Sequence, residues 1–187
     1  MIAALVTAAT LITYPPPRTQ GLKQGSDPQR GALSLPAELR RPLHLPRVAP
    51  GSRCPVSERH EVSADFAPAL GPGPVYPVGF DTSSTLHYRG AAFPPPWTGQ
   101  KVLWVAAPGY QGLIRIRGHQ LDGRWWVGFD GWRGRPYSEM RLLQATANPG
   151  AEWRQFPSYT RVRGHGCYAY QVDGLSFSLV LVFRAAP

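Results

Sequence analysis

The chain has 187 residues, enough for one folded domain with additional sequence, and its 20 Lys and Arg exceed its 11 Asp and Glu to give a net charge of +9. Pro (21) and Gly (20) together account for 41 of the residues, or about 22 %, against a usual background of roughly 12 %. These two residues are the least favourable in a helix interior, so the composition excludes a protein built of long helices.

Residues 2–14 form one apolar run. The run is shorter than the about 20 residues that a membrane-spanning helix needs, so the sequence predicts no transmembrane span. It has the length of the hydrophobic part of a secretory signal peptide, although no Lys or Arg precedes it. We interpret residues 1–14 as an export signal that lacks its basic start; a short buried strand or helix is the alternative.

Residues 15–53 contain eight prolines and neither Trp nor Phe. A segment of this composition cannot bury enough apolar area to offset the entropy lost on ordering. The sequence therefore predicts a disordered Pro- and Arg-rich linker, in which only residues 36–41 could form a helical turn. The folded domain is expected to begin near Cys54 and to cover residues 54–187.

After Cys54 the pattern changes to short β-type runs separated by turn signals such as Asp122-Gly123 and Asp173-Gly174. Regular spacing of this kind is typical of β-sandwiches and barrels. We predict an all-β, immunoglobulin-like antiparallel β-sandwich of seven to nine strands. The expected strands are residues 75–78, 85–88, 101–106, 113–117, 125–129, 139–143, 158–162, 167–172 and 176–183.

Side chains alternate between the two faces of a strand, which assigns faces within these runs. In 113–117 the two isoleucines are expected to face the core, while Arg115 and Arg117 point to water. In 167–172 the two tyrosines and the valine share one face, which places Cys167 on the other. This segment resembles the penultimate strand of an immunoglobulin-like sandwich, where a tyrosine near the start of the strand ties down the preceding corner.

Cys54 and Cys167 are the two cysteines of the chain, one at each end of the expected domain. In an exported domain such a pair predicts a disulfide, which would clamp the N-terminal segment onto the sheet. The loop between them spans 167 − 54 = 113 residues, and closing it stabilises a fold by about 4–5 kcal/mol in the chain-entropy model. Two unrelated buried thiols are the alternative.

Six segments of the C-terminal part form a set: Cys54-Pro-Val56, Gly73-Pro-Val-Tyr-Pro-Val-Gly79, Gln100-Lys-Val-Leu-Trp-Val-Ala106, Ile116-Arg-Gly-His-Gln-Leu-Asp-Gly123, Phe156-Pro-Ser-Tyr-Thr-Arg-Val162 and Gly166-Cys-Tyr-Ala-Tyr-Gln-Val-Asp-Gly174. Together they resemble a group of uncharacterised bacterial secreted or membrane-anchored β-sandwich proteins with a cysteine near each end. The resemblance covers about residues 54–187 and implies a fold and an extracytoplasmic location, but no activity. The chain departs from the pattern of that group in residues 124–133.

Known catalytic and metal-binding motifs are absent from the sequence. The five histidines show no metal-ligand spacing, and no nucleophile elbow, P-loop or dinucleotide fingerprint occurs. We therefore expect no enzymatic activity, cofactor or metal. A small hydrolase that uses Asp130 or Glu139 with a loop histidine is the rival hypothesis. No nucleic-acid partner is expected, because export separates the chain from nucleic acid and about half of the excess charge lies in residues 1–53.

An aromatic and arginine-rich stretch runs from Arg124 to Tyr137. Consecutive tryptophans on a strand face opposite sides, so one of Trp125 and Trp126 is expected to be exposed or to lie at an edge. Exposed aromatic rings beside arginines suit a glycan or a partner protein, whereas rings that close the end of the sandwich are the alternative. The sequence thus predicts a non-catalytic binding or structural module at the bacterial cell surface, with a carbohydrate-binding module or a small glycan hydrolase as alternatives. The candidate binding residues are Arg124, Trp125, Trp126, Trp132, Arg133 and Tyr137.

Overall fold

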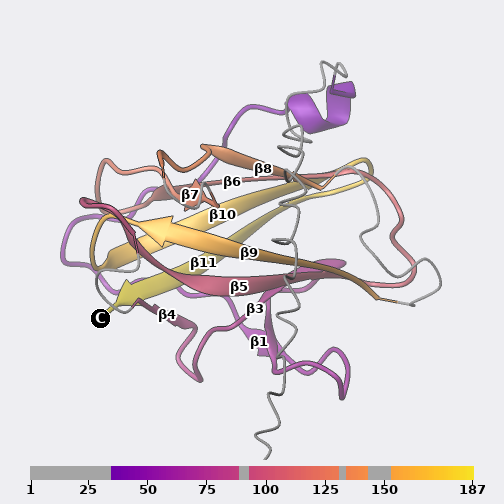
Figure 1. Ribbon diagram of the computed structural model, residues 1–187, viewed down its shortest axis with the longest axis horizontal. Coiled ribbons are helices and arrows are strands. Elements are labelled where there is room, and N and C mark those ends of the chain that lie inside the picture. The colour runs from indigo at the N-terminus through magenta and orange to yellow at the C-terminus, as the bar shows by residue number, and fades with distance from the viewer. Residues whose placement is uncertain (1–34, 89–92, 131–133, 143–152) are drawn as a thin grey trace, which may run out of the picture. The chain divides into compact units, whose positions relative to one another are not determined.

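The computed structural model describes residues 35–88, 93–130, 134–142 and 153–187. Two β-sheets face each other as a sandwich (Figure 1), which confirms the predicted all-β class. Helical structure in these ranges is limited to one 3₁₀ turn, η1 (Ala37–Arg40). Among the same residues, no helix has the length and apolar character needed to cross a membrane.

Sheet A contains six strands in the order β1-β2-β3-β5-β9-β7, each antiparallel to its neighbours. Strands β1 and β2 were not expected from the sequence, because two residues are too few to show an alternating pattern. The strands of sheet A are β1 (Arg59–His60), β2 (Ala69–Leu70), β3 (Val75–Val78), β5 (Thr98–Ala106), β7 (Gly128–Phe129) and β9 (Arg154–Val162).

Sheet B contains five strands in the order β4-β11-β10-β6-β8. Its pairs are antiparallel except for β4, which runs parallel to β11, so the expectation of a fully antiparallel sandwich is wrong at this edge. With eleven strands in the described residues, the expected seven to nine were also too few. The strands of sheet B are β4 (Thr85–His87), β6 (Ile114–Gln120), β8 (Glu139–Leu142), β10 (Gly166–Gly174) and β11 (Ser178–Ala186).

Aromatic side chains fill the space between the sheets. Trp104 of β5 packs edge-to-face on Tyr170 of β10, with ring centroids 5.0 Å apart, and Tyr170 stacks on Phe183 of β11 at 4.5 Å. The hydroxyl groups of Tyr170 and Thr160 lie 2.8 Å apart, which gives the dry interior one hydrogen bond between the two sheets. Burial raises the pKa of Tyr170 well above its usual range, so this hydroxyl stays neutral.

The alternation predicted for β10 is confirmed. Tyr168, Tyr170 and Val172 face the core, and Cys167 lies in a separate apolar cluster on the outer face of sheet B. Tyr168 also donates a hydrogen bond of 3.0 Å to the carbonyl of Gly164, four residues upstream. This contact fixes the turn before β10 in the manner expected of a corner tyrosine.

The outer face of sheet B is covered rather than wet. All but the first of the nine residues of β10 are buried, although a strand with one face on the core normally exposes every second residue. The cover is the segment 35–53, which we call the strap. The strap was predicted to be disordered linker, and for residues 35–53 that prediction is wrong; residues 15–34 lie outside the described residues. The folded domain therefore includes the strap and begins before the expected boundary at Cys54.

Arginine side chains of sheet B hold the strap through its backbone. Arg115 and Arg117 of β6 donate hydrogen bonds of 2.8 Å to the carbonyls of Leu39 and Arg41, so they do not point to water as predicted. In return, Arg41 donates to the carbonyls of Gly174 and Phe177 at 2.8 and 3.0 Å. These hydrogen bonds join the strap to sheet B. Each has a charged guanidinium group as donor and a neutral carbonyl as acceptor, and hydrogen bonds with a charged partner are among the stronger ones in proteins.

Asp173 of β10 organises this polar layer. Its carboxylate is fully buried and accepts hydrogen bonds from Arg117 at 2.7 Å and from Ser178 at 2.7 Å. Gln171 donates to both carboxylate oxygens at 3.1 Å and to the carbonyl of Pro42 at 2.9 Å, while its own oxygen accepts from the backbone N–H of His44 at 2.6 Å. One buried charge is therefore connected to the sheet and to the strap.

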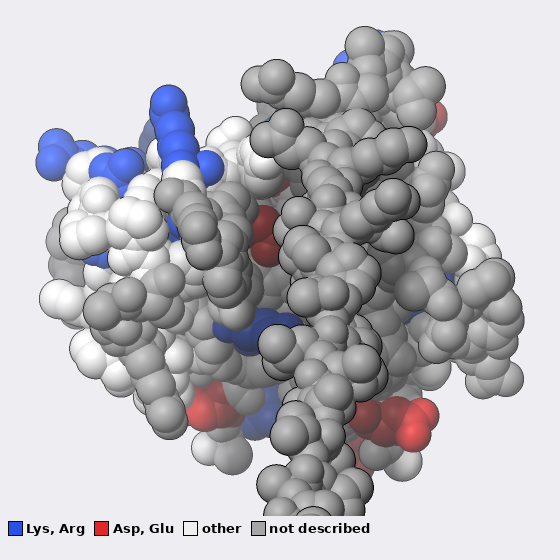
Figure 2. Space-filling view, in the orientation of Figure 1, with Lys and Arg blue, Asp and Glu red and all other residues white. Residues whose placement is uncertain are grey.

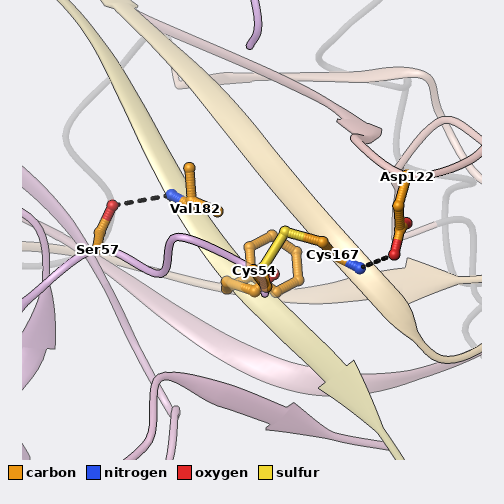
Figure 3. Close-up of a disulfide and its surroundings, with 6 residues drawn as sticks. Cys54, Ser57, Asp122, Cys167 and Val182 are labelled. Carbon is orange, nitrogen blue, oxygen red and sulfur yellow. Dashed lines mark hydrogen bonds between the residues drawn. A yellow bond between two sulfur atoms is a disulfide. The ribbon is translucent and has the colours of Figure 1, made fainter. Parts of the chain in front are cut away.

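The disulfide between Cys54 and Cys167 closes the end of the strap (Figure 3). The two Cα atoms lie 5.4 Å apart, which confirms the predicted pairing. Just beyond it, Ser57 joins β11: its N–H donates to the carbonyl of Val182 at 2.8 Å, and its hydroxyl accepts from the N–H of Val182 at 2.9 Å. From here the chain leaves the face of sheet B and enters β1 of sheet A.

We predict that Asp173→Ala lowers the free energy of unfolding by about 3 kcal/mol, because it leaves Arg117 partly buried without its counter-charge. Urea unfolding followed by tryptophan fluorescence measures this change. Arg184→Gln, which removes an exposed arginine of β11, is the matched control and should shift stability by less than about 0.5 kcal/mol. Equal stability of the two variants would show that the buried carboxylate does not hold the layer together.

Candidate functional site

The residues after β6 carry the chain from sheet B to sheet A at one end of the sandwich. Trp126 pairs with His119 of β6, and the N–H of Gln120 donates to the carbonyl of Trp125 at 2.7 Å. Two residues later, β7 pairs with β9 of the other sheet. A single extended segment, which contains Trp125 and Trp126, thus bridges both sheets.

The turn between β6 and this segment is anchored at the disulfide. The N–H of Cys167 donates to a carboxylate oxygen of Asp122 at 3.0 Å, as Figure 3 shows. The neighbouring Leu121 accepts from the N–H of Val48 in the strap at 3.2 Å and donates to the carbonyl of Cys167 at 2.7 Å. Arg124 and Trp125 therefore project from a turn that the strap and β10 hold in place.

Three tryptophans and two arginines stack against one another here. The ring of Trp126 packs edge-to-face on Trp97, with centroids 4.8 Å apart. The guanidinium of Arg163 lies 4.7 Å from the Trp97 ring centroid and 4.3 Å from that of Trp125. On Trp125 the guanidinium of Arg124 adds a second such contact, at 4.4 Å. We call these five residues the Trp–Arg cluster.

Only part of the expected binding site is assembled in the described residues. Arg124 and Trp125 stack as neighbours, and Trp126 joins them through Trp97 and Arg163. Both Trp125 and Trp126 are half-buried, so neither ring is fully exposed. Trp132 and Arg133 lie outside the described residues.

Tyr137, the remaining candidate, pairs with Phe129 across a hairpin and keeps 41 % of its surface exposed. The hairpin packs tightly against the cluster at Gly128. A Cβ atom there would lie 2.7 Å from the ring of Pro136 and 3.2 Å from Trp97. A residue without a side chain is therefore needed where β7 meets the cluster.

Trp97 and Arg163 were missed by the sequence analysis. Strands β5 and β9 pair with Thr98 opposite Val162, so Trp97 and Arg163 are the next residues along the same register. Each lies one residue outside its strand, and the two become neighbours only when the strands pair. The signal that could have found them is the pairing register of two strands that are separated in sequence by 154 − 106 = 48 residues, which local patterns do not contain.

Basic side chains dominate this end of the molecule. Arg124 and Arg135 are exposed and Arg163 is half-buried. In Figure 2 the basic side chains that project furthest gather at the upper left, over the loop-rich end at the left of Figure 1. Deeper in the same region, the buried Arg161 lies 4.0 Å from the ring of Phe93, and burial lowers its pKa while the charge of Asp130 partly opposes that shift.

The two acids of the rival hydrolase hypothesis both have structural contacts. Asp130 accepts a hydrogen bond of 2.9 Å from the N–H of Tyr159. Glu139 forms ion pairs with Arg115 and Arg141. Burial pushes the pKa of Glu139 upward, but the hydrogen bonds and charges of the two arginines outweigh it, so the pKa lies below its ordinary value. An acid held in its ionised form is a poor proton donor near neutral pH.

Metal ligands are likewise not gathered in the described ranges, where no three His, Cys, Asp or Glu side chains could hold one ion. Comparison with known proteins found no matching family model, no matching curated protein and no matching solved structure.

The depressed pKa of Glu139 gives a pH prediction. Because the folded state binds this proton less tightly than the unfolded chain, the ion pairs stabilise the fold above the unfolded pKa of about 4.3, and this contribution is lost as pH falls below it. We expect Glu139→Gln to be less stable by about 1.5 kcal/mol at pH 7 and to lose less stability between pH 5 and pH 3. Urea titrations across this pH range measure both, with the exposed Glu38→Gln as control; identical pH profiles for wild type and Glu139→Gln would contradict the assignment.

Proposed function

We propose that this chain is a non-catalytic binding module that works outside the cytoplasm, at the bacterial cell surface, and contacts its ligand through the Trp–Arg cluster. The observation that carries the proposal is the stacking of Trp97, Trp125 and Trp126 with two arginines at one rim of the sandwich. Aromatic rings and arginines in this combination are enriched at binding surfaces.

Incomplete burial of the tryptophans supports a binding role. Leaving apolar surface in water is unfavourable by roughly 25 cal/mol per Å². Trp125 and Trp126 both stay half-buried, although Trp104 shows that this sandwich can bury a tryptophan completely. A ligand that covers the exposed parts of the Trp–Arg cluster would recover part of that free energy.

The disulfide supports a location outside the cytoplasm. Bonds such as that between Cys54 and Cys167 persist in oxidising compartments and are rare in the reducing cytosol. The apolar run of residues 2–14, interpreted as an export signal, agrees with that location. The resemblance to secreted or membrane-anchored sandwich proteins points the same way.

The contacts of the acidic residues favour binding over hydrolysis. Glu139 is held as an anion by two arginines, and Asp130 is engaged by the backbone of β9. His119, a histidine that the rival hypothesis would place in a loop, lies in β6, and its Nδ1 atom is 2.7 Å from the carbonyl of Gln120. A paired acid and base with free lone pairs, which glycoside hydrolysis needs, is not what these contacts provide.

Binding to cell-envelope material tests the proposal. The immobilised full chain is incubated with glycan arrays and with purified bacterial cell-wall polymers, and the captured ligands are then measured against variants. We expect Trp125→Ala and Trp126→Ala to weaken binding at least about fivefold, because Trp125 holds the two guanidinium groups and Trp126 packs on Trp97 beside them. Trp153→Ala is the matched control, since Trp153 packs on Phe66 and Tyr76 away from the cluster.

Circular dichroism and urea midpoints establish that each variant is folded before binding is compared. Folded Trp125→Ala and Trp126→Ala variants that bind every captured ligand as tightly as wild type would overturn the proposal. Release of sugar fragments from the polymers by the wild-type chain would favour the hydrolase instead.

A further inference from the structure

The faces of Trp125 are occupied by arginine. The guanidinium carbons of Arg163 and Arg124 lie 4.3 and 4.4 Å from its ring centroid, which is the distance of direct stacking. A sugar ring that stacked on Trp125 would have to displace one of them. The groups that this part of the cluster offers to a ligand are therefore the N–H edges of the two guanidinium planes.

These arginines differ from the arginines of sheet B in their contacts. Arg115, Arg117 and Arg141 are each ion-paired with Glu139 or Asp173. Within the part of the chain that the structure describes, no ion pair or side-chain hydrogen bond is formed by the three arginines at the rim, Arg124, Arg135 and Arg163.

Arg163 is also incompletely satisfied as a donor. Its Nε atom is buried and finds no acceptor among the described residues. Buried donors without acceptors are uncommon, and each needs an explanation such as a ligand or a bound water. The Nε atoms of Arg117 and Arg154 are likewise buried without an acceptor in the part of the chain that the structure describes, so it is the other N–H groups of the half-buried Arg163 that a ligand at the rim can reach.

The nearest acids do not neutralise this surface. One oxygen of Asp122 accepts from the N–H of Cys167, and Asp130 accepts from the N–H of Tyr159 while its charge acts on the buried Arg161. Both carboxylates thus stabilise the loops from which the arginines project. The rim keeps the positive charges of Arg124, Arg135 and Arg163, and stacking on Trp97 or Trp125 partly fixes the guanidinium planes of Arg124 and Arg163. That arrangement is complementary to carboxylate, sulfate or phosphate groups.

We propose that the Trp–Arg cluster binds the anionic groups of an acidic polysaccharide; this inference rests on the proposed binding function. Arg124 and Arg163 hold the anions through their N–H edges, and Trp125 orients both guanidinium planes. The half-buried Trp126 and the exposed Tyr137 provide apolar surface for the neighbouring sugar rings. A polysaccharide suits the site because it supplies anions and sugar rings in one repeating chain.

Binding of defined polymers tests this inference. The full chain is titrated calorimetrically with polygalacturonate, heparin and neutral dextran, at about 0.1 M and about 1 M NaCl. We expect binding of one or both acidic polymers, no binding of dextran, and a loss of at least about tenfold in affinity at high salt. The double variant Arg124→Gln/Arg163→Gln should bind about tenfold more weakly than wild type.

Two further variants separate the geometry of the arginines from the net charge. Arg163→Lys keeps the charge but loses the planar fork, so it should resemble Arg163→Gln more than wild type. Arg40→Gln removes an exposed arginine of η1, next to Leu39, which contacts Arg115 at the opposite end of β6 and β10, and should leave affinity unchanged. If Arg40→Gln weakened binding as much as Arg163→Gln, attraction would be general and the assignment to the cluster would be wrong.

The remaining outcomes distinguish this inference from the proposed function. Binding of dextran as tightly as the acidic polymers, or tighter binding of a single-stranded DNA oligomer, would overturn the acidic-polysaccharide inference. Failure to bind either acidic polymer, combined with tryptophan-dependent capture of another cell-wall ligand, would overturn this inference and leave the proposed function standing. Failure of both experiments would overturn both.

Discussion

A buried carboxylate under a proline-rich strap is the constraint on which the rest of this structure depends. Asp173 has no access to water, and an unpaired charge in that position would be strongly destabilising. Its partners are Arg117, Gln171 and Ser178, and two of these also hold strap carbonyls or amides. Sheet B therefore needs the strap to bury its polar layer, and the strap needs the layer because it has little apolar surface of its own.

The strap is connected to the candidate site by a few direct contacts. The strap pairs with Leu121 and ends at the Cys54–Cys167 disulfide, and Cys167 holds Asp122. Arg124 and Trp125 follow Asp122 in the chain within three residues. Their stacking on Arg163 thus depends on a turn fixed from two sides, and a fixed turn lowers the entropy lost when a ligand is bound. The rigid support and the exposed arginines belong to one structural unit.

Much of the fold could be predicted because its signals are local. Alternation within 167–172 was enough to separate Tyr168 and Tyr170 from Cys167, and the two cysteines at the ends of the domain predicted their own bond. The strap could not be predicted in this way. Its contacts are made by carbonyls of Leu39, Arg41 and Pro42, and backbone acceptors leave no mark in the sequence. Proline-rich chain favours such contacts, since its carbonyls lack partners within the segment.

The arginines of β6 also show that sequence patterns do not reveal contacts with the strap. Alternation correctly placed Arg115 and Arg117 on the face of sheet B that points away from the core. It could not distinguish a face exposed to solvent from one covered by another segment of the chain. In the candidate site, the adjacent pair Trp125 and Trp126 stood out because of composition. Trp97 and Arg163 did not, because their neighbourhood exists only after β5 and β9 pair in register.

Amide hydrogen exchange along the full chain tests the central claim most directly, because it asks whether the strap belongs to the fold. The N–H groups of Leu39, His44 and Val48 each donate a hydrogen bond, to Pro36, to the side chain of Gln171 and to Leu121. The account predicts that His44 and Val48 are protected to a degree approaching that of β10, since losing the strap exposes the polar layer around Asp173. Exchange of both amides at the rate of an unstructured chain, while β10 stays protected, would contradict it.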